Sequence, residues 1–228
     1  MSSVLDRVIT RARLAIRHTR VEDIPQIVEI QNRVYPEIGG WRPEQLESQI
    51  KIFPQGQVVA CLGERVVGAA SSLIVQWGEW GAHHTWKEVT GNGSFSTHTP
   101  NARTLYGAEV FADPTLRRVG IGKKLYQARR QICRMLNLRR IMACGRMPGY
   151  QKVGNQMSPE DYAMRVIWGD LKDPVLMFQL QEGFQYCGVI NGYLPSDEES
   201  RGNATIIVWL NDRYKPKQPT VIPEGPIL

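Results

Sequence analysis

Apolar residues recur along the chain with two different spacings, and the change between them divides it into strands and helices. Short apolar or alternating runs bounded by turn residues predict strands at 14–18, 57–62, 66–75, 105–112, 140–145, 184–193 and 204–210. Apolar residues three or four positions apart predict helices at 21–35, 41–53, 120–137, 159–168 and 175–181. The main elements follow the order β-α-α-β-β-β-α-β-α-β-β, which indicates a mixed α/β fold rather than a regular β-α repeat.

Two of the predicted helices carry further local signals. Thr19 and Glu22 have capping-box spacing at the start of helix 21–35. Helix 120–137 has an apolar stripe that predicts its buried face, formed by Ile121, Leu125, Ala128, Ile132 and Met135. Arg129, Arg130 and Arg134 lie mostly off this stripe, so we expect them to be solvated rather than to form a nucleic-acid surface.

Composition limits the classes of function without selecting one. The 228 residues suffice for one domain with its own core. No apolar run approaches the roughly 18 residues of a membrane span, and no secretion signal is predicted. Four separated cysteines without a Cys-x-x-Cys motif indicate buried thiols in a reducing cytoplasm, and no metal site is predicted. The formal net charge of +6 suits an anionic partner, for which nucleic acid and a phosphorylated coenzyme both qualify.

The most informative motif is the run Arg117-Arg118-Val119-Gly120-Ile121-Gly122, between predicted strand 105–112 and helix 120–137. Its glycines allow a ligand to approach the backbone closely, and free N–H groups at a helix N-terminus bind anions. The run is not a P-loop, because Lys124 stands where Ser or Thr is required, and it is not a dinucleotide fingerprint, because Leu125 replaces the third glycine. An ordinary glycine turn that caps a helix is the alternative.

This motif, preceded by Val110-Phe111-Ala112-Asp113-Pro114, resembles the coenzyme A pyrophosphate loop of the GNAT superfamily of N-acetyltransferases, whose signature is Gln/Arg-x-x-Gly-x-Gly/Ala. The order of elements over roughly residues 12–211 also resembles that superfamily. The resemblance implies an α/β (α+β mixed) GNAT-like fold with a central, mostly antiparallel twisted sheet of about seven strands flanked by helices. We therefore expect one domain over residues 1–212, followed by a proline-rich tail or linker over 213–228 that shows no core pattern.

The resemblance also implies acetyl-CoA as cosubstrate. Its pyrophosphate is expected on the backbone amides of Arg118, Val119, Gly120, Ile121, Gly122 and Lys123. Arg117, Arg118 and Lys123 are expected to add charge-assisted contacts. The pantetheine arm is expected to pair with the backbone of the strand that contains Val110, Phe111 and Ala112.

Other runs resemble one GNAT group in which the acetyltransferase-like region precedes a nitrilase-type carbon–nitrogen hydrolase domain. They include Gly145-Arg146-Met147-Pro148-Gly149-Tyr150 and Met157-Ser158-Pro159-Glu160-Asp161-Tyr162. The chain stops where such a hydrolase would begin, so none of the hydrolase chemistry is expected in it. A carbon–nitrogen hydrolase and a second copy of the chain, forming a homodimer, are candidate partners.

Acetyl transfer to an amine needs a proton acceptor, because a free lysine amine has a pKa near 10.4. Glu109 lies beside the expected acetyl site and is the candidate base; a structural salt bridge or hydrogen bond is its alternative role. Many GNAT members place their glutamate three residues earlier, where this chain has Tyr106. An N–H of the Glu109 strand is the natural oxyanion donor. Direct transfer needs no covalent nucleophile on the enzyme, so this role is not assigned to Cys144.

The sequence indicates a general acid less clearly than it indicates the base. Many relatives use a tyrosine where this sequence has Gln179, and Tyr150, Tyr162, Tyr186 or Tyr193 are candidate substitutes that can equally be packing residues. The long irregular stretches 76–103 and 146–172 are expected to wall the acceptor site. Their aromatic residues either line that site or anchor the loops: Trp77, Trp80, Trp86, Tyr150 and Trp168.

The leading hypothesis is an N-acetyltransferase that transfers acetyl from acetyl-CoA directly to a small-molecule or peptide amine in the cytoplasm. The alternative is a catalytically silent acyl-CoA-binding module that regulates a hydrolase, motivated by the departures at Tyr106 and Gln179. Neither nucleic acid nor a membrane is expected as a partner. The net charge is the only feature that favours nucleic acid, and interleaved aromatic–basic motifs are missing.

Overall fold

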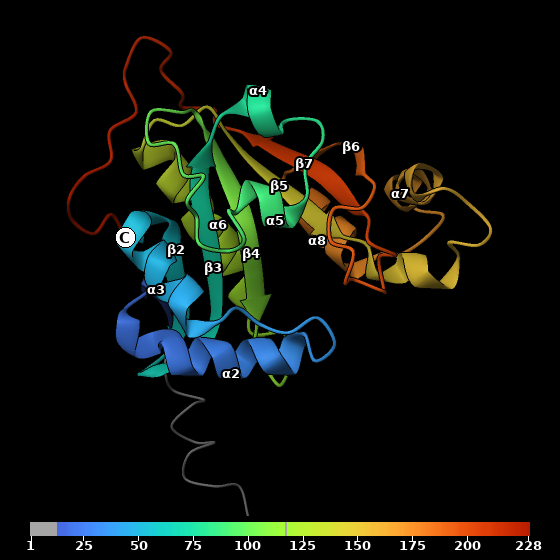
Figure 1. Cartoon of the computed structure of the whole chain (residues 1–228), viewed down its shortest axis with the longest axis horizontal. Coiled ribbons are helices and arrows are strands. Elements are labelled where there is room, and N and C mark those ends of the chain that lie inside the picture. The colour runs from blue at the N-terminus through green and yellow to red at the C-terminus, as the bar shows by residue number, and fades with distance from the viewer. Residues whose placement is uncertain (1–12, 117) are drawn as a thin grey trace, which may run out of the picture.

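Seven strands form one sheet in the computed structural model, which describes residues 13–116 and 118–228 (Figure 1). The strand order is β1-β2-β3-β4-β5-β7-β6, and all neighbours are antiparallel except β4 and β5. The bounds are β1 Leu14–His18, β2 Gln57–Leu62, β3 Arg65–Val75, β4 Thr104–Ala112, β5 Arg140–Arg146, β6 Gln185–Ile190 and β7 Ala204–Leu210. The prediction of a mixed α/β fold around a mostly antiparallel sheet is confirmed.

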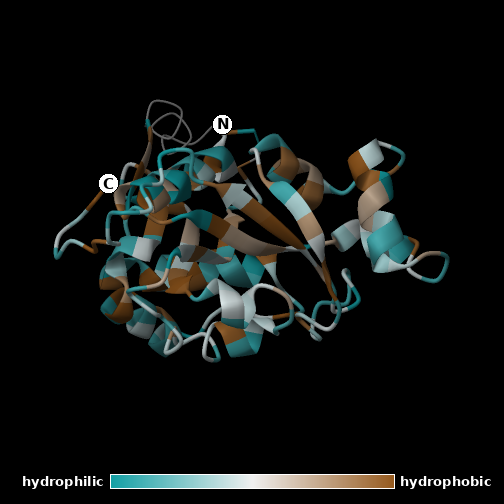
Figure 2. Ribbon diagram, turned by 90° about the horizontal axis from the view of Figure 1, so that it is seen from above, coloured by the Kyte–Doolittle hydropathy of each residue, from teal (hydrophilic) through white to brown (hydrophobic). Residues whose placement is uncertain are grey.

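Helices cover both faces of this sheet. One face packs on α2 (Ile24–Val34) and α3 (Pro43–Ile52), and the other packs on α6 (Ile121–Met135). Figure 2 shows brown hydrophobic segments in the sheet between these layers. The remaining elements are η1 Val21–Asp23, η2 Pro54–Gly56, α4 Trp77–Trp80, α5 Trp86–Val89, η3 Pro148–Lys152, α7 Pro159–Trp168 and α8 Pro174–Gln181. No helix in the described part of the chain has the length and apolar character to cross a membrane.

Strand β2 shows why the sheet needs both layers. All of its residues are buried: Val58 and Ala60 face the α6 side, whereas Val59 and Cys61 face the α2 side. A strand covered on both faces has a continuous apolar sequence rather than an alternating one. This is the pattern from which strand 57–62 is predicted.

The start of the first helical segment differs from the sequence prediction. The carboxylate of Asp23, rather than the Thr19–Glu22 pair, accepts the Arg20 N–H at 2.8 Å, and the chain makes the 3₁₀ turn η1 before α2 begins. Arg17 pairs with the same carboxylate at 2.6 Å. Because Asp23 carries a charge and is held by Arg17, it is the stronger acceptor for this free N–H.

Helix α6 corrects two further predictions. Met135 is 51% exposed although it belongs to the apolar stripe, because the helix ends there and Leu136 is buried instead. Arg129 is only 2% exposed although it lies off the stripe. Its guanidinium donates to the carbonyl oxygens of Ser71 and Glu109, so unpaired backbone acceptors draw this charged side chain inward.

The C-terminal segment 213–228 contains no helix or strand, but it packs against the domain. Ile227 is 8% exposed, and its N–H donates to Nε2 of His18 at 3.0 Å. Gln55 donates to the carbonyl of Pro223. In Figure 1 this red segment loops out and returns beside α3. The expectation that the segment lacks core residues is therefore wrong for Ile227, while the domain boundary at residue 212 stays a prediction.

Candidate active site

The parallel strands β4 and β5 are paired along only part of their length. Their register runs from Thr104 opposite Arg140 to Gly107 opposite Ala143. Beyond this point β4 continues against β3 and β5 continues against β7, so the two strands separate. Ser71 of β3 faces Glu109 and Ser72 faces Gly107, which makes Ala108 the extra residue of a β-bulge.

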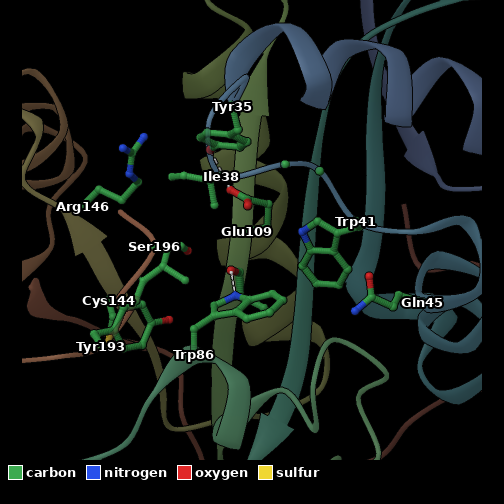
Figure 3. Close-up of a pocket in the computed structure, with 14 residues that line it drawn as sticks. Tyr35, Ile38, Trp41, Gln45, Trp86, Glu109, Cys144, Arg146, Tyr193 and Ser196 are labelled. Atoms are coloured by element: carbon green, nitrogen blue, oxygen red, sulfur yellow. Dashed lines mark hydrogen bonds between the residues drawn. The ribbon is translucent and has the colours of Figure 1, made fainter. Parts of the chain in front are cut away.

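A cavity of about 230 Å³ lies where these strands diverge (Figure 3). Strand β4 contributes Ala108 and Glu109, and β5 contributes Cys144 and Arg146. The other lining residues come from the segment between α2 and α3, from α3 and α5, and from the segment after β6: Tyr35, Ile38, Gly39, Gly40, Trp41, Gln45, Trp86, Tyr193, Leu194 and Ser196. The cavity is therefore apolar and aromatic over much of its wall, with one carboxylate at Glu109.

Glu109 is fixed in this cavity by hydrogen bonds. Its Oε1 accepts the Tyr35 hydroxyl at 3.0 Å and the N–H of Val110 at 2.9 Å. Burial raises the pKa of the Glu109 carboxyl above its ordinary value, and these hydrogen bonds oppose the rise. A carboxylate with a raised pKa takes up a proton more readily, so the same side chain is positioned structurally and suited to act as a base.

The backbone around Glu109 is held from both sides of the sheet. Arg129 of α6 donates to the Glu109 carbonyl and, at 3.1 Å, to Oγ of Ser72. On the other side, Nε1 of Trp86 donates to the Ala108 carbonyl at 3.2 Å. The bulge would otherwise leave these acceptors unpaired, so Arg129 and Trp86 stabilise the conformation that turns Glu109 into the cavity.

Arg146 is the cation at the cavity wall, and it is already paired. It donates to both carboxylate oxygens of Asp197 and lies 2.8 Å from the carboxylate of Glu199. Asp197 is 1% exposed; burial favours a higher pKa of its carboxyl, but the hydrogen bonds and charge of Arg146 together with hydrogen bonds from Ser200 lower the pKa below its ordinary value. The guanidinium charge is therefore neutralised within the protein, and Glu109 dominates the charge of the cavity.

A second polar network lies beside the cavity. The hydroxyls of Tyr106 and Tyr193 are 2.8 Å apart, and the Tyr106 hydroxyl is 2.9 Å from Nε2 of His84. Sγ of Cys144 lies 3.6 Å from the same nitrogen. Burial lowers the pKa of His84 to about 4 and raises that of Cys144 to about 12, so both are neutral near pH 7.

The glycine loop follows β4 and is anchored by Asp113. Oδ1 of Asp113 accepts the Thr115 N–H at 3.0 Å, and Oδ2 lies 2.8 Å from Arg65. Gly120, the N-cap of α6, has a φ of +81°, which favours glycine. No side chain caps this helix start. The first backbone N–H groups of α6 are thus suited to bind an anion.

The predicted coenzyme residues have different settings. Arg118, Val119, Gly120 and Lys123 are exposed at the loop, whereas Ile121 is buried under it. A Cβ on Gly122 would lie 3.3 Å from the Phe178 ring, so a side chain at this position would need the ring to shift by a few tenths of an ångström. Val110, Phe111 and Ala112 lie on the part of β4 that has no β5 partner. Arg117 lies outside the described residues.

Only one of the aromatic residues predicted to wall the acceptor site lines the described cavity, and that is Trp86. Trp168 is 67% exposed, and the Tyr150 hydroxyl donates to the carbonyl of Met157. Sequence reasoning missed Tyr35 and Trp41, since nothing in their local sequence indicates contact with residues some 70 positions away. Across the described residues, no group of three or more His, Cys, Asp or Glu side chains is arranged to hold a metal ion.

A model of the acetyltransferase (GNAT) family matches residues 24–153 of this chain. The protein described as an uncharacterized N-acetyltransferase, YkwB of Bacillus subtilis (strain 168), is 34% identical over 206 residues, which are 89% of this chain and 91% of YkwB. The probable hydrolase YhcX of the same organism is 36% identical over 218 residues. This match covers 96% of the chain but only 42% of YhcX.

Three solved structures illustrate the fold that this chain shares, and two of them, GphF and YncA, have an acyl-CoA bound. The GphF GNAT-like decarboxylase in complex with isobutyryl-CoA has a TM-score of 0.77 at 24% identity, covering 86% of this chain and 99% of GphF. The loading GNATL domain of CurA from Lyngbya majuscula has a TM-score of 0.78 at 21% identity, covering 87% and 98%. A putative acetyltransferase of Salmonella typhimurium, YncA with acetyl-CoA, has a TM-score of 0.50 at 16% identity, covering 88% and 95%. At these identities the likeness establishes the fold.

Proposed function

Because the chain belongs to the GNAT acetyltransferase family, we propose that it transfers the acetyl group of acetyl-CoA directly to the primary amine of a small-molecule or peptide acceptor. One observation carries this proposal. Strand β4 presents Glu109 to a partly open cavity and, a few residues later, leads into a glycine loop where no side chain of the described residues caps the first helix N–H groups. A single strand thus connects an anion-binding loop with a side chain that can accept a proton.

The coenzyme half of the reaction uses the loop. We assign the pyrophosphate to the N–H groups of Arg118–Lys123, where the dipole of α6 favours negative charge. The pantetheine arm is assigned to the stretch Val110–Ala112, which pairs with β3 on one side and has no β5 partner on the other, so that an extended partner can hydrogen-bond there as β5 does earlier along the strand. YncA, which has this fold, was solved with acetyl-CoA, and this supports a coenzyme of the same class for the chain.

The acceptor half uses the cavity. An acceptor amine arrives as an ammonium ion at neutral pH, and the aromatic rings of Tyr35, Trp41 and Trp86 together with the Glu109 carboxylate form a suitable environment for a cation. Glu109 then accepts one proton and leaves the amine nucleophilic. Arg146 already forms ion pairs with Asp197 and Glu199. Its guanidinium would therefore bind a carboxylate of the acceptor only weakly. We therefore expect amines without a neighbouring carboxylate as acceptors.

Proton transfer to Glu109 also affects the oxyanion site. The Val110 N–H is bonded to the Glu109 carboxylate. A protonated carboxyl is a weaker acceptor than a carboxylate, so protonation loosens this bond. The N–H then becomes available to the oxygen that gains negative charge during transfer, and such a donor contributes roughly 10²–10³ in rate elsewhere.

The competing proposal is a catalytically silent acyl-CoA-binding module that regulates a carbon–nitrogen hydrolase. It is supported by the match to YhcX, a longer protein named as a probable hydrolase, and by the absence of a tyrosine at Gln179. In the silent module the coenzyme binds at the same loop but no acetyl group leaves it. Acetyl transfer to an added amine therefore separates the two proposals.

The test combines binding and turnover. Calorimetry with acetyl-CoA should show binding at sub-millimolar concentration. Thiol release should rise in the presence of monoamines, diamines or amino-terminal peptides, and mass spectrometry should find the acetylated amine. Binding without thiol release for any amine would favour the silent module. A further arm uses malonyl-CoA without amine: release of carbon dioxide and acetyl-CoA would favour a decarboxylase such as GphF over an N-acetyltransferase.

A further inference from the structure

We propose that Tyr193 is the proton donor to the leaving coenzyme thiolate, and that Tyr106 and His84 are positioning residues that aim its hydroxyl into the cavity. This inference rests on the proposed acetyl transfer, and it supplies the general acid that the sequence does not show at Gln179. It is carried by the position of Tyr193 in the cavity wall and by the hydrogen bonds behind it.

The structure separates the four candidate tyrosines. The hydroxyl of Tyr150 donates to the Met157 carbonyl, and that of Tyr162 donates to the Asp173 carboxylate. Tyr186 is a half-buried residue of the edge strand β6 and packs toward the α6 side of the sheet. Tyr193 lines the cavity and is 4% exposed. Gln179 is itself buried and donates to the Tyr126 hydroxyl at 3.3 Å.

Tyr193 and Glu109 approach the cavity from opposite sides. Glu109 belongs to β4, whereas Tyr193 lies beside Cys144 of β5, and Figure 3 shows the space between them with Trp86 below. A thioester that follows Val110–Ala112 into the divergence of the strands arrives between these two side chains. One wall can then accept the proton of the ammonium while the other delivers a proton to sulfur.

The hydrogen-bond chain allows Tyr193 to donate into the cavity in the tautomer of His84 that carries its proton on Nε2. When Nε2 of His84 donates to the Tyr106 oxygen, the Tyr106 hydroxyl donates to the Tyr193 oxygen. The proton of Tyr193 is then free to point into the cavity. Burial keeps the pKa of Tyr193 well above its ordinary value, so the hydroxyl stays protonated between transfers. The same chain of donors stabilises the phenolate that forms briefly.

The step balances without another reactant. The amine attacks the thioester carbon, which gives a tetrahedral intermediate with an oxyanion and a positively charged nitrogen. As the carbon–sulfur bond breaks, its electron pair goes to sulfur, and the sulfur takes the Tyr193 proton. The Tyr193 phenolate then takes a proton from the nitrogen. The products are coenzyme A thiol and the neutral acetamide; Tyr193 is restored, and Glu109 releases the proton that it took from the ammonium ion to solvent.

The groups that face His84 leave it neutral during this step. Trp80 meets its ring edge-on at 6.0 Å, and the Tyr106 and Tyr193 rings lie at 5.5 and 5.7 Å. Cys144 is a neutral thiol there. Glu88 and His83 exert weaker electrostatic effects of opposite sign on His84. His84 therefore acts by orienting Tyr106 rather than by supplying an ionised group.

Steady-state kinetics of Tyr193→Phe test the proposal. Removing the hydroxyl should lower kcat by about 100-fold or more. The KM values for acetyl-CoA and amine, the acetyl-CoA Kd and the Tm should stay near wild type, because the ring is kept. Tyr106→Phe should lower kcat about tenfold, and the double variant should fall no further than Tyr193→Phe alone, because the residues act as one unit. Tyr186→Phe is the matched control and should behave as wild type.

The results that would overturn the proposal are distinct from those that would overturn the function. A kcat of Tyr193→Phe within about threefold of wild type, or losses that multiply in the double variant, would remove the role of Tyr193 while leaving acetyl transfer intact. Equal loss in Tyr186→Phe would assign the effect to packing. A wild-type protein that acetylates no amine would remove the proposed function, and with it this role.

Discussion

The glycine loop after β4 and the cavity beside Glu109 lie close together along the chain, yet they are built in opposite ways. The loop is formed by consecutive residues, Asp113 to Lys123, and presents backbone groups at an exposed helix start. The cavity collects side chains from several segments that are distant in sequence, and three of them, Trp41, Ala108 and Tyr193, are buried. We therefore expect changes in the loop to alter coenzyme affinity, and changes in the cavity to alter turnover and stability.

The largest expected effect is a loss of turnover when Glu109 of the cavity is replaced. Glu109→Gln should lower kcat/KM about 100-fold or more, because the amide cannot accept a proton from the ammonium ion. The loss should shrink as pH approaches the amine pKa near 10, where the acceptor is already neutral. A pH–rate profile at saturating acetyl-CoA measures this. Glu47→Gln, an exposed change on α3, is the control, and a constant ratio to wild type across pH would reject Glu109 as the base.

The second effect concerns the stability of the cavity floor. Arg129→Met should lower the free energy of unfolding by about 3 kcal/mol, because it leaves the buried carbonyl of Glu109 and its neighbours without their donor. Urea denaturation measures the loss. Arg134→Met removes a partly exposed ion pair with Asp212 and should cost less than about 1 kcal/mol. Equal losses for the two variants would show that burial of Arg129 has no special role.

The third effect belongs to the loop. Gly120→Ala places a Cβ in open space but at a φ of +81°, so its only cost is backbone strain of about 1–2 kcal/mol. We expect the acetyl-CoA Kd to rise by about fivefold to thirtyfold, with kcat at saturation unchanged. Calorimetry and kinetics together measure this. Gly78→Ala also enters open space, without a positive φ, and should leave the Kd unchanged.

The smallest expected effect also concerns the cavity, and it is a gain of stability rather than a loss. Because burial raises the pKa of Glu109, the folded protein pays for holding a carboxylate there once the pH exceeds the unfolded-state pKa near 4.3. Glu109→Gln removes that cost, so its Tm should exceed the wild-type value by a few degrees at pH 7. The gain should fade as the pH drops to about 4. A gain that persists below that pH would have a cause other than charge.

The same contrast explains what the sequence could predict. The loop is a contiguous motif, and the order of strands and helices along the chain follows from local apolar patterns, so both are predictable from single segments. The Tyr35–Glu109 hydrogen bond joins residues 74 positions apart and has no local signature. The apolar spacing of α6 does not predict the burial of Arg129. This burial depends on the β-bulge at Ala108, which forms only when β4 pairs with β3. Glu109 is predictable as a candidate from its strand, while its partners are not.

Arg129 has a consequence beyond stability. Its guanidinium has carbonyl and hydroxyl partners but forms no salt bridge with a carboxylate among the described residues, so a full positive charge remains beneath the bulge. In a poorly polarisable interior, the field of such a charge is weakly screened. The field is present before the substrates arrive and needs no rearrangement during the reaction. The β-bulge thus does more than shape the cavity: it holds a permanent electrostatic source directly under Glu109.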